Sequence, residues 1–424
     1  MSKKTGGIFA FLGLLGLSVF FLSCGTSVSR SSGVLFVVSQ GSNQVSSYAI
    51  DQSTGNLSYI KTGASTCATA SCGFPLNIIL DPTNASAFVL NQGAASSGVA
   101  ASIYAYTVNS DGTLTGAGNV APAVFVSGDQ AVAMTRDAGG KFLFVVTQGF
   151  TPAPTTCDAP QPPTGCPLLY VFATQPGSTS LSLVGKTTLT KIPTSVAMIT
   201  LTSPPAAMAE TLLYVTFNKD LVGTNDNTVG EYSVDSSGNV LEKTGSPYVT
   251  GAAPSAVLAV DTYPPGGNTG GLFVYVTNQS IDNNVSVFQV CIVPNGNPCT
   301  AQGVQDAIMT AVGSPVGVGQ APVALVVDPT NNFLYVACET SNQVYAFRIS
   351  TATGVLSGLN PPTVGTGSGP VAMVMHPTGN FLYLYVSNNT SSNVSGFTVN
   401  TTGGQLSNPI TVISLGQPAG LVAR

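Results

Sequence analysis

The sequence predicts an all-β protein: a seven-bladed β-propeller of four-stranded antiparallel blades, with the ring closed by the C-terminal strand. Three observations predict this fold. A strand motif recurs seven times, its first copy lacks a preceding strand, and the missing strand stands at the end of the chain. A small sheet with two apolar faces cannot bury them alone, so it needs neighbouring copies of itself. The expected propeller spans residues 33–424.

The clearest copy of the repeat covers residues 322–356. It contains apolar runs at 323–327, 333–337 and 344–349, separated by Asp-Pro-Thr-Asn-Asn and Thr-Ser-Asn turns and followed by a Thr-Gly turn. Short runs rich in Val, Tyr and Phe, bounded by Asn, Asp, Pro and Gly, are typical of strands in an antiparallel meander. The first two runs show little polar alternation, which indicates that both faces of the sheet are covered.

The second strand of this unit can be followed along the whole chain. It recurs at 35–38, 88–91, 142–146, 213–216, 273–278, 333–336 and 381–388. Six copies follow an apolar first strand, which starts near Pro75, Ala131, Ser195, Pro254, Pro322 and Pro370. Only the N-terminal segment precedes the first copy, whereas residues 416–423 resemble residues 319–326 with one residue dropped. We therefore expect residues 417–423 to pair with residues 34–39 and close the ring.

The N-terminal segment is predicted to be a targeting signal rather than part of the fold. Lys3 and Lys4 precede an apolar stretch at 8–22 that is too short and wrongly flanked for an ordinary spanning helix. The run Phe-Leu-Ser-Cys resembles a bacterial lipobox, which makes residues 1–23 a lipoprotein signal peptide and Cys24 the lipidated residue. A plain secretory signal is the alternative. Residues 24–32 are expected to be a flexible tether.

Composition fits an exported protein and argues against nucleic acid as a partner. Only 7% of residues are charged, and the 47 Gly and 28 Pro are distributed as turns between apolar runs. The isoelectric point near 4.7 and the lack of any basic cluster after Lys4 argue against nucleic acid. We expect a monomer without cofactor, held to the membrane by its N-terminal lipid on the periplasmic or cell-surface side. Its partner would be a small molecule, a carbohydrate or an envelope protein.

The cysteines support an oxidising compartment. Six of the eight fall in close pairs within insertions between strands, and we expect disulfides Cys67–Cys72, Cys157–Cys166 and Cys291–Cys299. A zinc site is the alternative, but it needs closely spaced His and Cys ligands in fours, and the chain has one His and no C-x-x-C motif. We therefore expect no metal site. Cys338 remains, at the end of a strand, and is expected to be a buried free thiol.

The repeat carries a family resemblance. Residues 275–278 read Tyr-Val-Thr-Asn, and the unit runs P-V-A-x-x-x-[DH]-P, then F-L-Y-V, N-x-V-x-x-[FY] and T-G-x-L. This pattern resembles the YVTN repeats of seven-bladed lactonase-like propellers, a family that includes bacterial 6-phosphogluconolactonase and carboxy-muconate cyclase-like enzymes. The resemblance covers residues 33–424 and implies the propeller fold. It implies lactone hydrolysis only weakly, because one propeller fold hosts many functions and no catalytic motif of the family can be matched here.

Four ionisable residues are weak catalytic candidates: Arg136, Asp129, His376 and Glu339. Arg136 replaces an apolar residue at the end of a first strand, so it either points into the central channel or is neutralised by Asp129 and Asp137, which is the favoured interpretation. His376, the only histidine, aligns with aspartates in the turn after the first strand and is interpreted as a turn residue. Glu339 is expected to pair with Arg348 across a hairpin as an ordinary surface pair.

A set of polar side chains stands at or just after the end of the second strands. By propeller geometry these would ring one face and form a possible binding face, although turn chemistry also explains them and is the favoured interpretation. They are Gln40, Asn91, Gln148, Asn218, Asn278 and Asn388, with Glu339 in the remaining copy. Four long insertions, at 149–168, 201–212, 262–271 and 291–311, exceed what a hairpin needs. The oxygen-rich stretch 220–227 lacks ordered ligand spacing and is interpreted as a loop.

Two functions remain open from the sequence. The first is a lactonase-like, envelope-anchored lipoprotein that serves as a ligand-binding, protein-binding or scaffold module. The second is a lactonase of the 6-phosphogluconolactonase-like, carboxylic-ester hydrolase type, acting on a sugar lactone outside the cytoplasm. Scarce His, Glu and Arg favour the first, because lactone hydrolysis needs an activated water and a group that polarises the carbonyl. The convergence of an ionisable pair in the central channel would favour the second.

Overall fold

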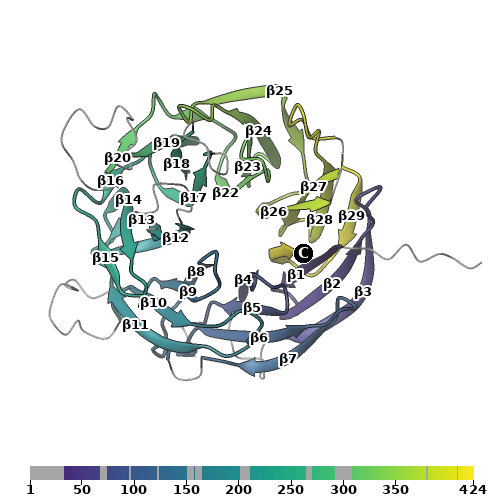
Figure 1. Cartoon of the computed structure of the whole chain (residues 1–424), viewed down its shortest axis with the longest axis horizontal. Coiled ribbons are helices and arrows are strands. Elements are labelled where there is room, and N and C mark those ends of the chain that lie inside the picture. Colours follow the sequence, from purple (N-terminus) through teal and green to yellow (C-terminus); the bar gives the residue numbers. More distant parts are fainter. Residues whose placement is uncertain are drawn as a thin grey trace, which may run out of the picture. The chain divides into compact units, whose positions relative to one another are not determined.

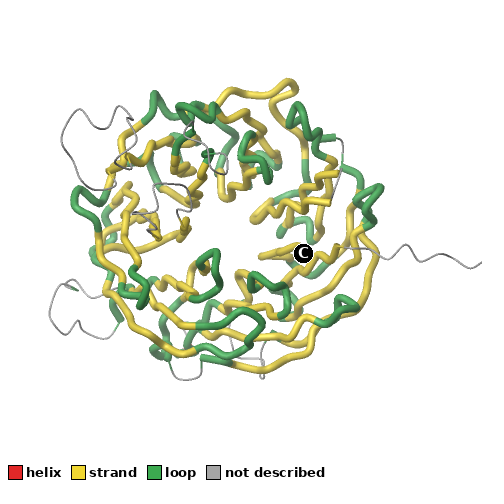
Figure 2. Tube along the Cα trace, viewed as in Figure 1, coloured by secondary structure: helices red, strands yellow, loops and turns green. Residues whose placement is uncertain are grey.

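The computed structural model of the chain describes residues 33–66, 74–94, 97–121, 124–149, 157, 165–200, 211–263, 270–291, 308–378, 381–407 and 409–424. The expected signal peptide and tether lie outside these residues, as do most of the long insertions. The described residues form strands joined by turns, without an α-helix (Figure 2). Correspondingly, this part of the chain holds no helix long and apolar enough to cross a membrane.

The strands form seven antiparallel sheets, here called blades 1 to 7, which confirms the predicted fold. Blade 1 consists of β30 (Pro418–Ala423), β1 (Gly33–Ser39), β2 (Gln44–Ile50) and β3 (Leu57–Ser65). Blade 2 consists of β4 (Pro75–Leu80), β5 (Ser86–Asn91), β6 (Ser102–Val108) and β7 (Leu114–Asn119). Blade 3 consists of β8 (Ala131–Arg136), β9 (Phe142–Thr147), β10 (Leu168–Ala173) and β11 (Ser182–Thr188).

Blades 4 and 5 depart slightly from the four-stranded plan, because the outermost strand of each is broken into two pieces. Blade 4 consists of β12 (Lys191–Thr200), β13 (Thr211–Asp220), β14 (Asn225–Val234), β15 (Val240–Glu242) and β16 (Tyr248–Val249). Blade 5 consists of β17 (Pro254–Asp261), β18 (Leu272–Asn278), β19 (Asn284–Cys291), β20 (Ile308–Ala311) and β21 (Val316–Gly317). Strand β12 begins at Lys191 rather than near the predicted Ser195, and β-bulges interrupt its pairing with β13.

Blades 6 and 7 complete the ring. Blade 6 consists of β22 (Pro322–Val327), β23 (Phe333–Cys338), β24 (Gln343–Ile349) and β25 (Leu356–Gly365). Blade 7 consists of β26 (Pro370–Thr378), β27 (Phe381–Asn388), β28 (Asn393–Thr398) and β29 (Thr411–Ser414). The first strand of each blade lies nearest the centre (Figure 1) and contacts the first strands of both neighbouring blades, from β30 through β4, β8, β12, β17, β22 and β26 back to β30.

The C-terminal strand closes blade 1, as the sequence predicts. Strand β30 pairs with β1, so that Phe36 faces Val422 and Val37 faces Leu421. Backbone hydrogen bonds extend the pairing at both ends: Val34 and Arg424 exchange N–H···O bonds of 3.1 and 3.0 Å, and Gln40 N–H donates to Gln417 O at 2.9 Å. The two ends of the described chain therefore complete one sheet.

The core lies between adjacent blades. Alternate residues of β1 serve two different neighbours: Phe36 and Val38 pack with blade 2, whereas Leu35 and Val37 pack with blade 7. Every residue of β1 is buried, and the same holds for β5, β9, β18 and β23. The lack of polar alternation in the second strands therefore reflects burial of both faces.

Contacts between blades explain why a tyrosine in the second strand and a glycine after the third strand recur from unit to unit. The tyrosine of the second strand donates its hydroxyl hydrogen to the carbonyl of a glycine in the turn after the third strand of the next blade, which is a Thr-Gly turn in two cases and a Gly-Gly turn at residues 403–404. The three bonds are Tyr275 to Gly354 at 2.9 Å, Tyr335 to Gly404 at 2.7 Å and Tyr385 to Gly55 at 2.8 Å. Each of these glycines has a positive φ. A Cβ on Gly404 would also overlap the Phe333 ring, so the turn requires glycine.

The cysteines agree with prediction where they are described. Cys157 and Cys166 form a disulfide, and Cys338 is a buried free thiol whose pKa burial raises to about 12. Cys291 is disulfide-bonded. Cys299, Cys67 and Cys72 lie outside the described residues, so the Cys291–Cys299 and Cys67–Cys72 pairings stay predictions. Lipidation of Cys24 also falls outside them.

Candidate functional site

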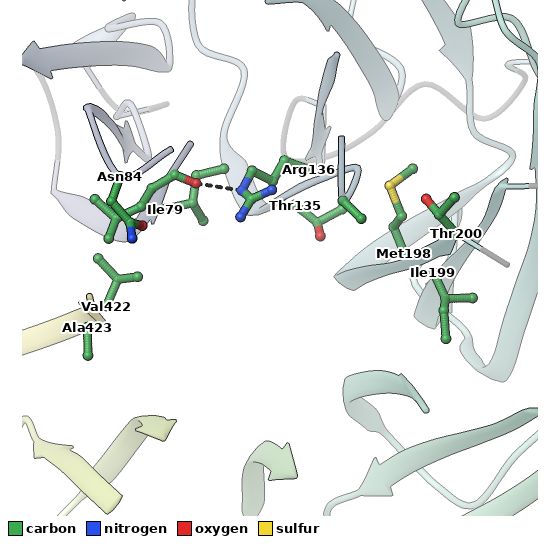
Figure 3. A pocket seen from close by; sticks show the side chains of 11 residues that line it. Ile79, Asn84, Thr135, Arg136, Met198, Ile199, Thr200, Val422 and Ala423 are labelled. Carbon is green, nitrogen blue, oxygen red and sulfur yellow. Dashed lines mark hydrogen bonds between the residues drawn. The ribbon is translucent and has the colours of Figure 1, made fainter. Parts of the chain in front are cut away.

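A cavity of about 470 Å³ lies at the ends of the first strands of blades 1 to 4 (Figure 3). Because all first strands run in the same direction, their C-terminal ends bring distant parts of the chain to one end of the channel. The lining residues are Ile79, Leu80, Asn84, Thr135, Arg136, Ala138, Met198, Ile199, Thr200, Val422 and Ala423. Most of these side chains are apolar. Arg136 is the only ionisable one among the described residues that line the cavity.

Arg136 ends β8 and is held by the backbone of two blades. Its Nε–H donates to Leu80 O of blade 2 at 2.5 Å, and Nη1 donates to Asp137 O at 3.0 Å. Burial lowers the pKa of the guanidinium from its ordinary value, and the charges of Asp137 and Asp81 oppose that shift. An arginine still remains protonated at neutral pH. The structure therefore presents a fixed guanidinium at the cavity wall, with the charges of Asp137 and Asp81 nearby.

Asp129 does not join Arg136. It precedes β8, whereas Arg136 ends the same strand, so the two lie at opposite ends of the channel wall. The Asp129 carboxylate is buried, where it accepts hydrogen bonds from Gly149 N–H at 2.9 Å and the Tyr170 hydroxyl at 3.3 Å. Burial raises its pKa, partly offset by these bonds and by one from Thr147. Asp129 thus ties blade 3 together, and the expected neutralisation of Arg136 by Asp129 is wrong.

His376 is not a turn cap. It lies inside β26, is 4% exposed, and contacts Gly33 of blade 1 closely enough that a Cβ there would overlap the imidazole. Its Nε2 has no hydrogen-bond partner in the described part of the chain, and burial lowers its pKa to about 4. The aligned Asp81 and Asp328 instead accept several N–H bonds within their turns. His376 is therefore a buried packing residue at the junction of blades 7 and 1.

Glu339 and Arg348 do not pair, which corrects the sequence interpretation. In the β23–β24 hairpin Arg348 lies opposite Phe333, at one end, whereas Glu339 follows Cys338 at the other end. The Arg348 guanidinium lies 4.6 Å from the centre of the Phe333 ring. Glu339 is exposed. An ion pair in blade 4 joins Lys191 to Asp226, with Nζ and Oδ2 2.8 Å apart.

The polar residues of the possible binding face divide into two groups. Asn91, Asn278 and Asn388 are fully buried and donate Nδ2–H to Ser102, Ser286 and Ser395 of their own blades at 3.1, 2.9 and 3.0 Å. These three side chains stabilise hairpins and are not presented to a ligand. The outcome agrees with the favoured structural interpretation and removes these three residues from the possible binding face. Gln40 and Gln148 are half-buried, and Asn218, also half-buried, lies within β13 rather than after it. For these three residues a binding role stays a prediction.

Sequence reasoning missed Glu231, a fully buried carboxylate in β14. It accepts a hydrogen bond from the Tyr214 hydroxyl at 3.0 Å. A signal was available, because the equivalent third-strand positions in other blades hold the small or apolar residues Ser47, Val287, Ala346 and Gly396. Elsewhere in blade 4 the oxygen-rich stretch 220–227 forms a hairpin, and the described residues hold no group of three or more potential metal-ligating His, Cys, Asp or Glu side chains.

Solved structures with the same architecture include three bacterial proteins. The periplasmic gluconolactonase of Pseudomonas aeruginosa superposes with a TM-score of 0.66 and 17% identity over 92% of this chain and 98% of its own. A protein of Lactobacillus plantarum gives 0.65 and 15% over 92% and 99%. A candidate 6-phosphogluconolactonase of Bacteroides fragilis gives 0.60 and 15% over 94% and 99%. At these identities the similarity establishes the fold alone.

Sequence comparison identifies the family. No curated protein sequence matches the chain. The family model described as "Lactonase, 7-bladed beta-propeller" matches residues 168–418, more than half of the chain. That match agrees with the seven blades and with the Tyr-Gly contacts that explain the repeat. The chain therefore belongs to the lactonase family of seven-bladed β-propellers.

Proposed function

We propose that this chain is an exported, envelope-anchored propeller that binds a ligand in its central cavity without hydrolysing it. The observation that carries the proposal is the dispersal of the ionisable candidates. Arg136 lines the cavity, Asp129 is buried at the other end of β8, His376 is buried between blades 7 and 1, and Glu339 is exposed beyond β23. A lactonase needs a base that activates water close to a group that polarises the carbonyl.

Asp81, whose charge acts on Arg136, is a poor base. Asp81 accepts hydrogen bonds from backbone N–H groups of Thr83, Ser86 and Gly177. Burial alone would raise its pKa, but the hydrogen bonds from Thr83, Ser86 and Gly177 outweigh burial and hold the pKa below its ordinary value. A carboxylate stabilised in its charged form has little tendency to take a proton from water. The cavity is thus better suited to holding a molecule than to cleaving it.

Export is supported by three observations. The Cys157–Cys166 disulfide is typical of proteins that mature in an oxidising compartment. The N-terminal sequence, with Lys3, Lys4 and the lipobox-like run ending at Cys24, supports anchoring by a lipid. One structural neighbour is a periplasmic protein, the gluconolactonase of Pseudomonas aeruginosa. These observations support a place in the cell envelope.

The rival function is lactone hydrolysis, favoured by membership of the lactonase family. An assay separates the two. The purified protein would be given glucono-1,5-lactone and 6-phosphogluconolactone, and ring opening would be measured against the spontaneous rate, with Arg136→Ala and His376→Ala as comparisons. We expect little or no acceleration. A large acceleration that is lost in Arg136→Ala would overturn the proposal and make the chain a hydrolase.

A further inference from the structure

The cavity at the ends of β30, β4, β8 and β12 has the features of a small-molecule site. Its volume of about 470 Å³ lies within the range of ligand pockets, roughly 300–1,000 Å³. Its wall combines apolar side chains with a few polar groups, an arrangement typical of such pockets. Figure 3 shows Ile79 on one side of Arg136 and Met198 on the other, with Val422 and Ala423 below Ile79.

The guanidinium of Arg136 keeps donors free for a ligand. Two of its five N–H groups are used, one by Leu80 O and one by Asp137 O. The Nη2 group has no acceptor in the described part of the chain. Because both anchoring carbonyls belong to the backbone, they fix the side chain without cancelling its charge. The planar fork of an arginine matches the two oxygens of a carboxylate.

The nearby acids do not take up these donors. Asp81 Oδ1 accepts the N–H groups of Ala85 and Ser86, and its Oδ2 accepts Thr83 and Gly177. Asp137 Oδ1 accepts Phe142 N–H at 2.5 Å. Both carboxylates act on Arg136 through their charge. Neither forms a hydrogen bond with the guanidinium within the described residues. The half-buried guanidinium therefore lacks a hydrogen-bonded counter-ion.

We propose that this cavity binds a small organic carboxylate with an apolar body, and that Arg136 pairs with the carboxylate group. A single cationic side chain in the wall favours a ligand with a single negative charge. Met198, Ile199 and Val422 supply the apolar contact, and the wall also carries the Thr135 hydroxyl and the exposed Asn84 amide, neither of which has a side-chain hydrogen bond in the described residues. This inference rests on the proposed binding function and names its ligand class.

The test is a binding titration with matched probes. Calorimetry on the full chain would compare acetate, hexanoate, benzoate and gluconate with hexanamide, the neutral counterpart of hexanoate. A second readout comes from Ala138→Trp. The chain has no tryptophan, and Ala138 is an exposed turn residue on the cavity wall, so the new indole would report occupancy by its fluorescence. We expect hexanoate to bind at least about tenfold more tightly than hexanamide, since hydrogen bonds to charged groups are the stronger ones.

Two substitutions at Arg136 separate its charge from its structural contacts. Both Arg136→Met and Arg136→Lys lose the guanidinium bond to Leu80 O, but only the lysine keeps the positive charge. We expect Arg136→Met to weaken hexanoate binding on the order of ten- to one-hundredfold and to leave hexanamide unchanged. Arg136→Lys should retain most of the affinity. Arg348→Ala, which removes an exposed arginine of blade 6, is the matched control and should change neither probe.

The outcomes distinguish this inference from the proposed function. Failure of every carboxylate to bind more tightly than about 10 mM, or equal affinity for hexanoate and hexanamide, would overturn the carboxylate site. Equal losses in Arg136→Met and Arg136→Lys would do the same, because they would show a structural role. Rapid lactone hydrolysis would instead overturn the non-catalytic function while leaving carboxylate binding measurable.

Discussion

His376 occupies a repeat position that holds an aspartate in three other blades, and the two residue types behave differently. Asp81 and Asp328 follow the last residue of their strands and accept N–H bonds from the turn that begins there. Strand β26 instead continues to Thr378, so His376 pairs with Tyr383 inside the sheet and packs against Gly33. The imidazole is kept neutral by burial rather than by a partner.

Neutral burial of His376 predicts acid sensitivity in a defined window. Its pKa is 6.5 when unperturbed and about 4 in the fold, so below pH 6.5 the unfolded chain binds a proton that the folded chain does not. Stability contributed by this residue is therefore complete above pH 6.5 and is lost as the pH falls toward 4. In His376→Leu we expect the melting temperature to vary less across this interval, measured by circular dichroism.

The aspartates provide the internal comparison for this experiment. Asp51, Asp81 and Asp235 have pKa values held below 3.8 in the fold, so their contribution is present above pH 3.8 and is lost below it. Both wild type and His376→Leu should share that loss. Identical curves for the two proteins between pH 6.5 and 4 would contradict the assignment to His376.

At the scale of elements, the glycine-containing turns after the third strands accept hydrogen bonds from tyrosines of the preceding blade. Gly404 has a φ of +77°, its carbonyl accepts the Tyr335 hydroxyl at 2.7 Å, and the Phe333 ring covers its Cα. Both aromatic residues belong to β23 of blade 6, whereas the turn belongs to blade 7. The spacing of the repeat therefore encodes a contact between units as well as strands within one unit.

Substitutions at this contact test its contribution. We expect Tyr335→Phe to cost about 1 kcal/mol of unfolding free energy, because it removes one hydrogen bond from a buried carbonyl. Gly404→Ala should cost more than about 2 kcal/mol, since it adds a left-handed alanine and an overlap with Phe333. Gly365→Ala is the control, because Gly365 has no positive φ and a Cβ there meets no atom. Denaturant unfolding with equal losses at Gly365 and Gly404 would refute this account.

At the scale of residues 33–424 taken together, closure is the property that distinguishes a ring from an open stack. Strand β30 lies between β1, its sheet partner, and the first strands β4 and β26, which it contacts on either side. It contributes Ala419 to the core between blades 1 and 2, and Leu421 to the core between blades 7 and 1. Residues 418–423 thus connect blade 1 to both of its neighbours, blade 2 and blade 7.

Deleting residues 416–424 should open the ring. The expected result is loss of the cooperative melt, because β1 would lose its inner partner and two inter-blade cores would lose side chains. Differential scanning calorimetry would measure this. Removal of Arg424 alone, which costs two terminal backbone bonds to Val34 and the Nη2 hydrogen bond to Asn109 O, is the milder comparison. An unchanged melting profile after the longer deletion would show that closure does not stabilise the ring.

The sequence by itself determined the strands, the number of blades, the closure by residues 417–423 and the free Cys338, together with the family resemblance. It could do so because strand and turn signals are local, and because a repeated unit presents the same signals seven times. The Cys157–Cys166 pairing was equally accessible, since the two residues are close in the chain.

Only the tertiary structure decided the chemistry of the site. Arg136 donates a hydrogen bond to the Leu80 carbonyl of another blade, and Asp129 accepts one from the Tyr170 hydroxyl. Hydrogen bonds within their own hairpins engage the amides of Asn91, Asn278 and Asn388. None of these outcomes follows from the repeat pattern. The pattern shows which residues occupy equivalent positions in different blades, but it does not show which side chains they contact. A side chain's charge and hydrogen-bonding capacity are set by the groups that surround it in space, and in a closed ring many of those groups come from adjacent blades.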